Sequence, residues 1–365
     1  MRSQSRVLRR LAYSVALFIL MATGPDLKRL ACEDSVSEVA ISMEQICPGH
    51  ADRAGLSLYR PSQVVAGSEK RFFVYDAGNG RILRFGSDGR LQVTIGNSGD
   101  SQKRLEVSPY SGALMALDAH DSVFASVPGS RFIRVYDADG VYLRSISLPF
   151  SQIAGLAAAP DGSLLVSPLS PRITATVFRF SPEGRLVASF GSRIVAVNGH
   201  TASQINASLL AVGRDGSIFQ AFVGWPIVRK YRPDGTQLWE ATYDVPPALR
   251  KVIPAELTLD NVRANPGREI AVNGVAFAVV PTLDGGCRIM TNGFGLVRID
   301  PRGQVAGVRV IAVDPNWDDR FFSHFALSSD ERSLLLLDNV GGRVFRVSAP
   351  ETDSLFTLPK APIAR

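Results

Sequence analysis

Histidine and cysteine are scarce in this chain of 365 residues, which contains four histidines and three cysteines. A catalytic zinc ion usually takes three protein ligands and keeps one coordination position open. The chain also has no His-Glu-x-x-His motif, no Gly-x-Ser-x-Gly motif and no glycine-rich phosphate-binding loop ahead of a helix. The sequence therefore lacks the signatures of the common metalloproteases, serine hydrolases and nucleotide-binding enzymes.

An excess of one charge is nearly absent once the first residues are set aside. The whole chain has 40 Lys+Arg and 34 Asp+Glu, and residues 1–24 hold four arginines and no acidic residue. The remaining 36 basic and 34 acidic residues leave a net charge of about +2. Nucleic-acid binding depends on attraction between clustered Lys or Arg and phosphates, and no dense basic run is present. We therefore expect no nucleic-acid partner.

Long hydrophobic runs are absent except near the N-terminus. Four arginines precede an apolar run at residues 11–21, and Ala22-Thr23-Gly24 follows it. A basic start, a short apolar run and small residues are typical of a secretory signal peptide. We expect cleavage after Gly24 and a secreted or periplasmic protein without stable membrane insertion. Two alternatives remain open: an uncleaved anchor, and lipidation at Cys32, where Arg29 replaces the apolar residue expected at a lipoprotein site.

A repeated turn organises the rest of the chain. Apolar runs at residues 72–75, 81–85 and 91–95 are separated by turns rich in Gly, Asn and Asp, which indicates three antiparallel strands. The second turn recurs as a basic residue, a β-forming residue and a turn closed by glycine, with the glycines at Gly89, Gly140, Gly184, Gly235 and Gly303. Their separations of 51, 44, 51 and 68 residues lie near the period of propeller blades.

A second marker, a turn that leads into an apolar strand, precedes the first and begins at Pro160, Arg214, Asp284 and Ser329. Each unit is therefore predicted to contain four strands joined by turns. We count six units, at residues 61–96, 112–149, 153–191, 207–243, 272–313 and 322–359. The sequence predicts an all-β fold, a six-bladed β-propeller of four-stranded antiparallel blades, in which ring closure protects most strand edges.

Two segments also resemble a known family. Tyr75-Asp76-Ala77-Gly78-Asn79-Gly80-Arg81-Ile82 is similar to the central segment of NHL repeats, and residues 337–344 are a looser second match. The resemblance implies a six-bladed β-propeller, in agreement with the count of repeats. Members of that family include protein-binding modules, RNA-binding modules and a zinc-dependent lyase, so the resemblance does not select a function.

The predicted domain organisation has a signal peptide at residues 1–24, an N-terminal segment outside the clear blades at 25–60, the propeller at 61–359 and a C-terminal tail at 360–365. Residues 354–358 can supply the outer strand of blade six, and closure by a strand from residues 36–43 is an alternative. Long connections at 192–206, 244–272 and 314–320 each lead from one blade to the next. We expect them to gather around one mouth of the channel, where long loops are often functional.

Resemblances to known propellers also suggest possible metal sites. The zinc-dependent lyase suggests zinc, but only His200 and His324 are expected at one mouth, because His50 lies outside the ring and His120 faces the other way. Asn273-Gly274 and the turn after it resemble a blade of the gluconolactonase and regucalcin group, which implies a calcium-type site. That group has Asp where this chain has Asn292, and no matching Glu lies near the first blade. We predict no cofactor, with zinc or calcium at His200, His324 and Asn273 as the alternative.

Turn residues and cysteines have structural interpretations. Asp side chains in turns accept hydrogen bonds from nearby backbone N–H groups, which accounts for Asp76, Asp88, Asp139, Asp161, Asp215, Asp234 and Asp284 without catalysis.

In an oxidising compartment Cys32 and Cys47 can form a disulfide worth about 3 kcal/mol of stability by loop entropy. Cys287 follows a turn on a predicted strand and is expected to be a small buried hydrophobic residue.

Aromatic and arginine residues remain as candidates for partner binding. The set on or near the loop-rich mouth is Trp225, Trp317, Arg320, Arg131 and Arg172. Such side chains provide large contact area and bidentate hydrogen bonds, although the tryptophans can equally pack the loops onto the ring. We predict a monomeric propeller that binds a protein, peptide or glycan partner without catalysis. The alternative is a metal-dependent lyase or lactonase-like hydrolase with its site at the channel mouth.

Overall fold

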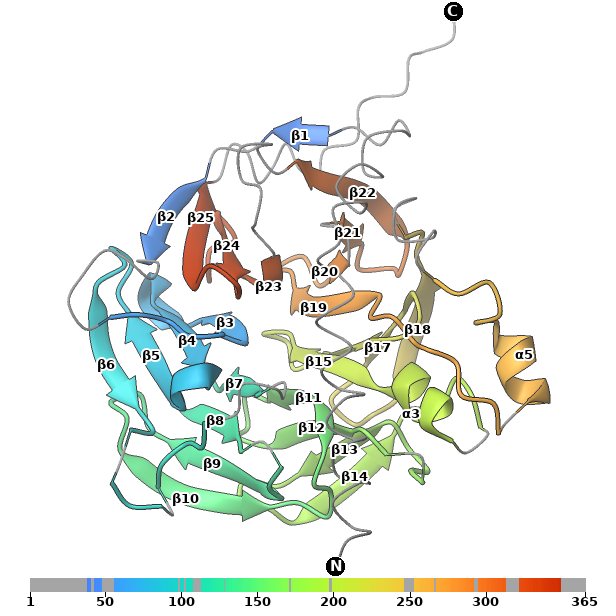
Figure 1. Cartoon of the computed structure of the whole chain (residues 1–365), viewed down its shortest axis with the longest axis horizontal. Helices are drawn as coiled ribbons and strands as arrows, with labels where there is room; N and C mark the ends of the chain where they lie inside the picture. The colour runs from blue at the N-terminus through green and yellow to red at the C-terminus, as the bar shows by residue number, and fades with distance from the viewer. Residues whose placement is uncertain are drawn as a thin grey trace, which may run out of the picture.

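The structure is a computed structural model that describes residues 38–40, 43–47, 56–97, 99–101, 103–107, 113–127, 129–170, 172–196, 199–245, 253–265, 267–291, 295–312 and 322–348. These residues form six sheets arranged in a ring (Figure 1). Neighbouring strands are antiparallel in every sheet, apart from one added parallel strand described below. The six-bladed β-propeller predicted from the repeated turns is therefore confirmed.

Six blades follow one another along the chain. Blade one contains β3 (Gln63–Ala66), β4 (Phe72–Asp76), β5 (Arg81–Phe85) and β6 (Leu91–Ile95), and blade two contains β7 (Met115–Leu117), β8 (Val123–Ser126), β9 (Phe132–Tyr136) and β10 (Tyr142–Ser147). Blade three contains β11 (Ile153–Ala158), β12 (Leu164–Pro168), β13 (Val177–Phe180) and β14 (Leu186–Phe190), and blade four contains β15 (Ser208–Val212), β16 (Ile218–Phe222), β17 (Ile227–Tyr231) and β18 (Gln237–Thr242). Blade five contains β19 (Ala276–Pro281), β20 (Cys287–Thr291), β21 (Gly295–Ile299) and β22 (Val305–Ala312), and blade six contains β23 (Phe322–Leu327), β24 (Ser333–Asp338) and β25 (Arg343–Ser348).

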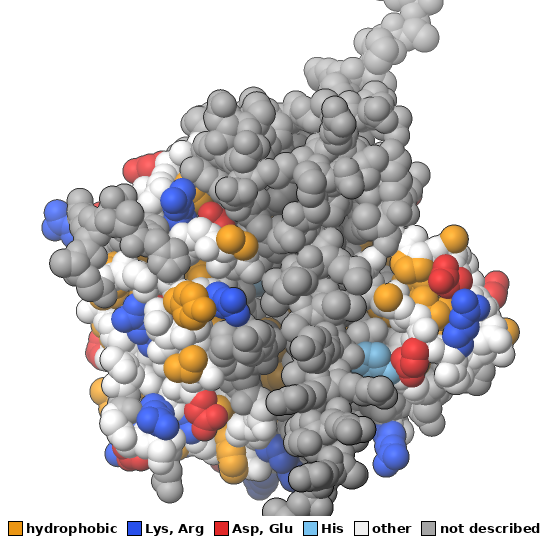
Figure 2. All heavy atoms as spheres, in the orientation of Figure 1, with side chains coloured by type: hydrophobic (Ala, Val, Ile, Leu, Met, Phe, Trp, Pro, Cys, Tyr) orange, Lys and Arg blue, Asp and Glu red, His pale blue; other side chains and the backbone are white. Residues whose placement is uncertain are grey.

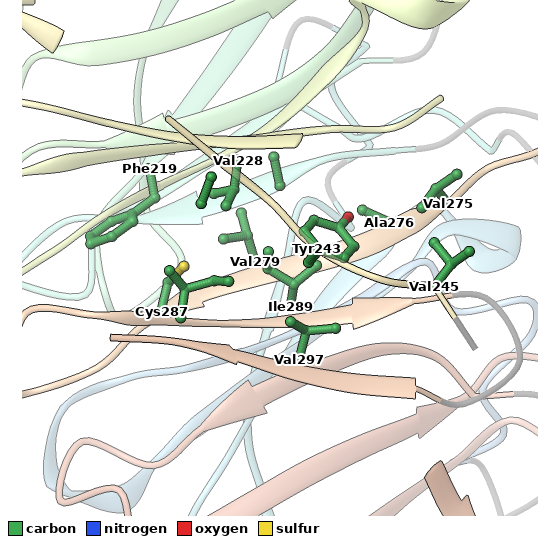
Figure 3. Close-up of a cluster of buried hydrophobic side chains, with 13 residues drawn as sticks. Phe219, Val228, Tyr243, Val245, Val275, Ala276, Val279, Cys287, Ile289 and Val297 are labelled. Atoms are coloured by element: carbon green, nitrogen blue, oxygen red, sulfur yellow. The ribbon is translucent and has the colours of Figure 1, made fainter. Parts of the chain in front are cut away.

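The hydrophobic core lies in layers between neighbouring blades. All residues of β16 and β17 are buried, because a middle strand is covered by the next blade on each side. Between blades four and five, Phe219 and Val228 pack against Val279 and its neighbours in blade five, in the cluster drawn in Figure 3. Most residues of the outer strand β18 are exposed. The apolar runs of the sequence therefore mark the middle strands, which are buried on both faces.

One turn geometry recurs at one end of the ring. In the turn at residues 86–90, Gly86 N donates to Arg90 O and Gly89 N donates to Gly86 O, and Gly89 has φ of 76°. The same pair of backbone bonds closes the turns at 118–122, 137–141, 159–163, 181–185, 213–217, 232–236, 282–286 and 300–304. Glycine adopts this left-handed conformation without steric cost, which explains the regular glycines in the sequence. Asp121 takes the same conformation, with φ of 61°, in blade two.

The ring is closed by a strand from the N-terminal segment. β2 (Glu44–Cys47) pairs antiparallel with β25 and forms the outer strand of blade six. β1 (Glu38–Ala40) pairs parallel with β22 and adds a fifth strand to blade five. The segment expected to lie outside the blades therefore contributes two strands, and residues 44–47 close the ring rather than 36–43. Residues 354–358, the other candidate, lie outside the described part of the chain.

Two short helices lie beside blade four, at the right of Figure 1. α3 (His200–Asn206) occupies the connection into blade four, and α5 (Leu259–Ala264) occupies the connection out of it. Thr258 caps α5 by accepting a hydrogen bond from Asn261 N, which satisfies one free amide at the helix start. Within the described residues no helix has the length and apolar character needed to cross a membrane.

Candidate functional site

The two ends of the ring differ in construction. We use the term turn face for the end that carries the tight turns after the first and third strands of each blade. The term mouth face is used for the opposite end, where the loops between second and third strands lie beside the connections from blade to blade. In the view of Figure 2, hydrophobic, basic and acidic side chains are intermixed over the described surface. No large area of one charge is visible in that view.

Carboxylates on the turn face are occupied by structural hydrogen bonds. Asp161 Oδ1 accepts from both the backbone N–H and the hydroxyl of Ser163, and Asp215 Oδ1 does the same with Ser217. Burial opposes ionisation of Asp161, but these hydrogen bonds and the Arg179 guanidinium together hold its pKa below its usual value. The same bond to a turn amide is made by Asp88, Asp234 and Asp284. These turn aspartates therefore act in folding, as their positions predict. In the turn of blade two the prediction named the wrong residue, because Asp137 rather than Asp139 accepts from the turn amides.

The basic residue of the repeated marker also has a structural role. Arg179 donates to Asp161 and Ser163 in its own blade and to the Pro233 carbonyl oxygen in blade four. At the same position of other blades, Arg84 donates to Ala138 O, Lys230 to Gly285 O and Arg346 to Ser87 O. Each bond joins a third strand to a turn of the next blade. These basic side chains hold the blades together and leave the turn face without a free cationic group at these positions.

The mouth face above blade four is built up by a second hydrophobic cluster. Ile194, Val195, Ala202, Ile205, Leu257, Val262, Ile270 and Val272 pack together over Phe222 and Ile227 of the blade. Asn206 joins the pieces, because its side chain accepts from Ile194 N and donates to Val195 O and Ala202 O. The described parts of the two connections around blade four therefore form a packed structure on this face.

The NHL-like segment of blade one forms a closed polar network on the mouth face. Asp76, which is fully buried, accepts from Tyr59 N at 2.7 Å, from Asn79 Nδ2 at 2.8 Å and from Arg81 Nε at 2.8 Å. Arg81 and Asn79 also donate to Ser57 O. The motif thus fixes the segment that leads into blade one, and its charged residues serve folding rather than chemistry.

The corresponding segment of blade six is arranged differently. Asp338 is buried, and its Oδ1 accepts from Val340 N and Gly341 N within its own loop. Arg343 pairs in register with Asp338, as Arg81 does with Asp76, but its Nε is buried without a hydrogen-bond partner. Asn339 Oδ1 is also buried without a partner. This loop therefore carries a donor and an acceptor that the described residues leave unsatisfied.

Three exposed hydrophobic side chains lie around these two loops. Tyr59 is 41% exposed, Val107 is 62% exposed and Val340 is 56% exposed. The Arg60 guanidinium lies over the Tyr59 ring at 5.5 Å from its centroid. We call this group, with Arg343 and Asn339, the blade one–six surface.

The inner strands provide few polar groups to the channel. Gln63 accepts from Met115 N, and Ser208 belongs to a buried chain of hydrogen bonds with Ser167 and Gln220. His324 lies on β23, and its Nδ1 is buried without a hydrogen-bond partner. Burial lowers the pKa of His324 to about 4, against smaller opposing effects from the Val64 and Phe325 backbones. His324 is therefore neutral near pH 7.

The three metal candidates come from different parts of the ring, and their role stays a prediction. His200 begins α3 between blades three and four, His324 lies in blade six, and Asn273 precedes β19 of blade five. His200 N donates to Glu269 at 3.3 Å, which fixes it to the connection above blade four. Within the described ranges, no three His, Cys, Asp or Glu side chains are grouped so that they could hold a metal ion.

The residues proposed for partner binding are spread over several blades. Trp225 is half-buried against the cluster above blade four. Arg131 is exposed in blade two, where its Nε donates to Leu148 O, and Arg172 is exposed in blade three. Trp317 and Arg320 lie outside the described residues. Whether the described three bind a partner stays a prediction.

The blade one–six surface was not predicted as a site. The looser NHL-like match at residues 337–344 contains Asn339, Val340 and Arg343, but Tyr59 and Val107 lie outside both matches. The position of Tyr59, just before the first blade, could have drawn attention to it. Its backbone is held by Gly78 N, which donates to Tyr59 O. A contact between residues so far apart leaves no periodic pattern in the sequence.

Two cysteines are described, and both are buried thiols. Cys287 is fully buried in the cluster between blades four and five, as its position on a strand predicts. Burial raises the pKa of Cys47 to about 12, with a smaller contribution from Asp76. Cys32 lies outside the described residues, as do His50 and the signal segment, so the Cys32–Cys47 disulfide stays a prediction.

Comparison with known proteins supports the fold. No protein-family model and no curated protein significantly matches this chain. A structural genomics protein of unknown function from Bacteroides thetaiotaomicron is 14% identical over 85% of this chain and 76% of that chain, with a TM-score of 0.55.

Two further solved structures are similar over most of their length. Virginiamycin B lyase from Staphylococcus aureus is 10% identical over 84% of this chain and 99% of that chain, with a TM-score of 0.51. The protein U3-55K is 13% identical over 85% of this chain and 99% of that chain, also with a TM-score of 0.51. At these identities the comparisons show the fold alone, a β-propeller, and membership of the NHL-repeat family stays a prediction.

Proposed function

We propose that this protein is a secreted or periplasmic β-propeller that binds a protein, peptide or glycan partner at its mouth face without catalysis. The observation that carries this proposal is the difference between the two faces of the ring. The turn face consists of short turns whose carboxylates and basic residues are used in folding. The mouth face carries a packed addition above blade four, built from the connections into and out of that blade. Exposed hydrophobic side chains occur at both ends of the ring, for example Val107 on the mouth face and Val141 on the turn face.

The polar groups near the channel favour binding over catalysis. General acid–base chemistry needs a group with a suitable pKa within hydrogen-bond reach of the reacting atom. The inner strands offer His324, whose pKa is lowered to about 4 by burial, and Ser323, whose hydroxyl is buried without a hydrogen-bond partner. Gln63 and Ser208 hydrogen-bond within the protein. Binding makes no such demand, because exposed Tyr, Val and Arg side chains provide contact area and hydrogen bonds directly.

Secretion is tested by the mature N-terminus. The basic residues, the apolar run and the small residues of the first 24 positions motivate this part of the proposal. Mass spectrometry of protein purified from the organism that makes it should show a chain beginning at Pro25. A chain that still begins near Met1 would contradict cleavage, and a lipid attached at Cys32 would identify a lipoprotein instead.

Partner binding is tested on the purified mature protein. The immobilised protein is exposed to a glycan array and, separately, to the extracellular or periplasmic protein fraction of its own organism. We expect saturable binding of one class of molecule with one-to-one stoichiometry. Absence of saturable binding in both experiments at micromolar concentration would contradict the proposal.

The alternative, a metal-dependent lyase or lactonase-like hydrolase, is separated by elemental analysis of the same preparation. The binding proposal predicts well under one equivalent of zinc or calcium after gel filtration. One tightly held equivalent per chain would favour the enzyme, since a structural or catalytic metal site retains its ion on that timescale.

A further inference from the structure

One modification motif in the sequence lies where the chain enters blade four. Asn206-Ala207-Ser208 has the form Asn-x-Ser, the acceptor triplet for N-linked glycans. No other asparagine in the sequence is followed two positions later by Ser or Thr. Such glycans are bulky and are carried on the surface of secreted proteins. The surroundings of Asn206 therefore decide whether the folded protein can carry one.

The structure places both residues that the motif requires in the interior. α3 ends at Asn206, and β15, the inner strand of blade four, begins at Ser208. Asn206 is 1% exposed, and Ser208 is fully buried. The Ser208 hydroxyl lies 2.8 Å from the Ser167 hydroxyl and accepts from Gln220 Nε2 at 2.8 Å. The triplet is therefore part of the packed junction between blades three and four.

The side-chain amide of Asn206 uses all of its hydrogens inside the protein. An asparagine Nδ2 carries two hydrogens. In Asn206 it donates to Val195 O at 2.9 Å and to Ala202 O at 2.8 Å, while Oδ1 accepts from Ile194 N at 2.7 Å. Val195 and the adjacent Ile205 are fully buried in the cluster above blade four. The amide nitrogen therefore has no free hydrogen and faces packed side chains and backbone.

Glycan transfer is incompatible with this arrangement. In the transfer, Nδ2 bonds to the anomeric carbon of a glycosyl polyprenyl diphosphate, the bond from that carbon to the diphosphate oxygen breaks, and Nδ2 loses one proton. The modified amide keeps a single N–H, so the carbonyl oxygen of Val195 or Ala202 is left buried without its donor. The sugar would also need space that the close-packed cluster does not provide. A glycan on Asn206 and the native entry into blade four exclude each other.

We infer that a glycan at Asn206 blocks folding of this propeller, and that the chain matures in a compartment where Asn-x-Ser triplets are not glycosylated. A glycosylating secretory pathway modifies chains as they enter, when Asn206 is not yet buried. The first part depends only on the packing around Asn206. The second part rests on the proposed export and narrows it to a periplasm or another compartment without transfer to this motif.

Translation in vitro with endoplasmic reticulum microsomes tests both parts. A signal sequence for the endoplasmic reticulum replaces residues 1–24, so entry does not depend on the chain's own signal. Endoglycosidase treatment identifies the glycosylated chains, and limited proteolysis after detergent lysis compares their folding with that of unmodified chains. Each translation supplies both forms of the same chain, so the central comparison needs no substitution.

The chain offers a matched exposed control. Asn97 is exposed, and Gly99→Ser would make the triplet at 97–99 an acceptor. A Cβ at Gly99 meets no atom within 4 Å. The double variant Gly99→Ser with Ser208→Ala carries this exposed acceptor and lacks the one at Asn206. Its glycosylated chains should resist the protease as well as its unmodified chains do.

Wild-type chains that carry a glycan should be digested about tenfold faster or more than unmodified wild-type chains, because they lack the protection of the fold. Equal resistance of the two wild-type forms would overturn the first part. Glycan on Gly99→Ser chains at Asn97, together with none at Asn206 in the wild type, would overturn the second part, since the motif would then escape modification during entry.

These outcomes are independent of the tests of the proposed function. A mature N-terminus near Met1 or the absence of a partner would contradict that function and leave the exclusion at Asn206 in place, because the microsome experiment uses a foreign signal. Protease-resistant glycosylated wild-type chains would overturn the present inference and leave export and partner binding in place.

Discussion

Arg81 and Arg343 occupy the same position in two copies of one loop, but only Arg81 bonds to the aspartate of its own loop. Arg81 Nε donates to Asp76 Oδ2 at 2.8 Å, and Asp76 is fully buried. Arg343 pairs in register with the buried Asp338, yet its Nε is buried without a hydrogen-bond partner. The first arginine therefore holds its loop together through this bond, and the Nε of the second does not.

The two arginines should differ in their contribution to stability. Arg81→Ala should lower the free energy of unfolding by about 2 kcal/mol, because the buried Asp76 loses its cationic partner. Arg343→Ala should lower it by less than about 0.5 kcal/mol, as for a side chain without such a partner. Urea unfolding of the two variants measures the difference. Equal losses would show that Arg343 also serves the fold.

The bond from Arg179 to the next blade should stabilise the ring. Arg179→Ala removes donors to Asp161, Ser163 and Pro233 O, so it should lower the free energy of unfolding by about 1–2 kcal/mol. Arg185 in the same blade is the control, because its ion pair with Glu183 spans 3.7 Å in an exposed position. Arg185→Ala should cost less than about 0.5 kcal/mol. If Arg179→Ala lowers the free energy of unfolding no more than Arg185→Ala does, the bond from Arg179 to the next blade does not stabilise the ring.

Close packing of inner strands makes Gly155 intolerant of a side chain. A Cβ at Gly155 would lie 2.3 Å from the Ser208 carbonyl oxygen in the neighbouring blade. Gly155→Ala should therefore lower the free energy of unfolding by about 2 kcal/mol or more, through displacement of β11 from β15. Gly99→Ala is the control, because no atom lies within 4 Å of the added carbon. Near-equal midpoints of chemical unfolding for the two variants would contradict this packing.

His324 should make stability depend on pH. Its pKa in the fold is lowered by burial to about 4, below the value of about 6.5 for an unfolded chain. The unfolded chain therefore binds more protons between these values, and the free energy of unfolding should fall as pH decreases from about 6.5 to about 4. His324→Gln should flatten this part of the profile in thermal unfolding. Asp330 acts in a different pH range. A hydrogen bond from the Ser328 hydroxyl is the main cause that lowers its pKa to about 2, so its contribution to stability is lost only below about pH 4.

An unchanged slope between pH 6.5 and 4 in His324→Gln would show that the pKa of His324 in the fold stays near its value in the unfolded chain. That outcome would also weaken the argument that the inner strands lack a group able to exchange protons near neutral pH.

The fold was predictable because its turns use a conformation that few residues accept. Gly89, Gly140, Gly184, Gly235 and Gly303 all have positive φ, so each left a glycine in the sequence at a regular place. The closing strand β2 was not predictable in the same way. It has four residues, and its partner β25 lies about 300 residues later, which leaves no local pattern.

The candidate site was less predictable than the fold. Whether Tyr59 is exposed or buried depends on Gly78, and whether Arg343 is paired depends on the geometry of Asp338 within its loop. Arg81 and Arg343 look alike in sequence, and only side-chain geometry distinguishes them. Trp225 was chosen as a candidate because of its residue type alone. In the structure it is half-buried against the cluster above blade four.

Immobilisation in two orientations tests the central claim, that the mouth face binds the partner. Biotin is attached to a side chain introduced at Val340 on the mouth face or at Leu283 on the turn face, two positions of nearly equal exposure, 56% and 54%. Each form is then exposed to the glycan array and to the protein fraction. We predict saturable binding when the protein is held through position 283, and its loss when it is held through position 340. Equal binding in the two orientations would contradict the account.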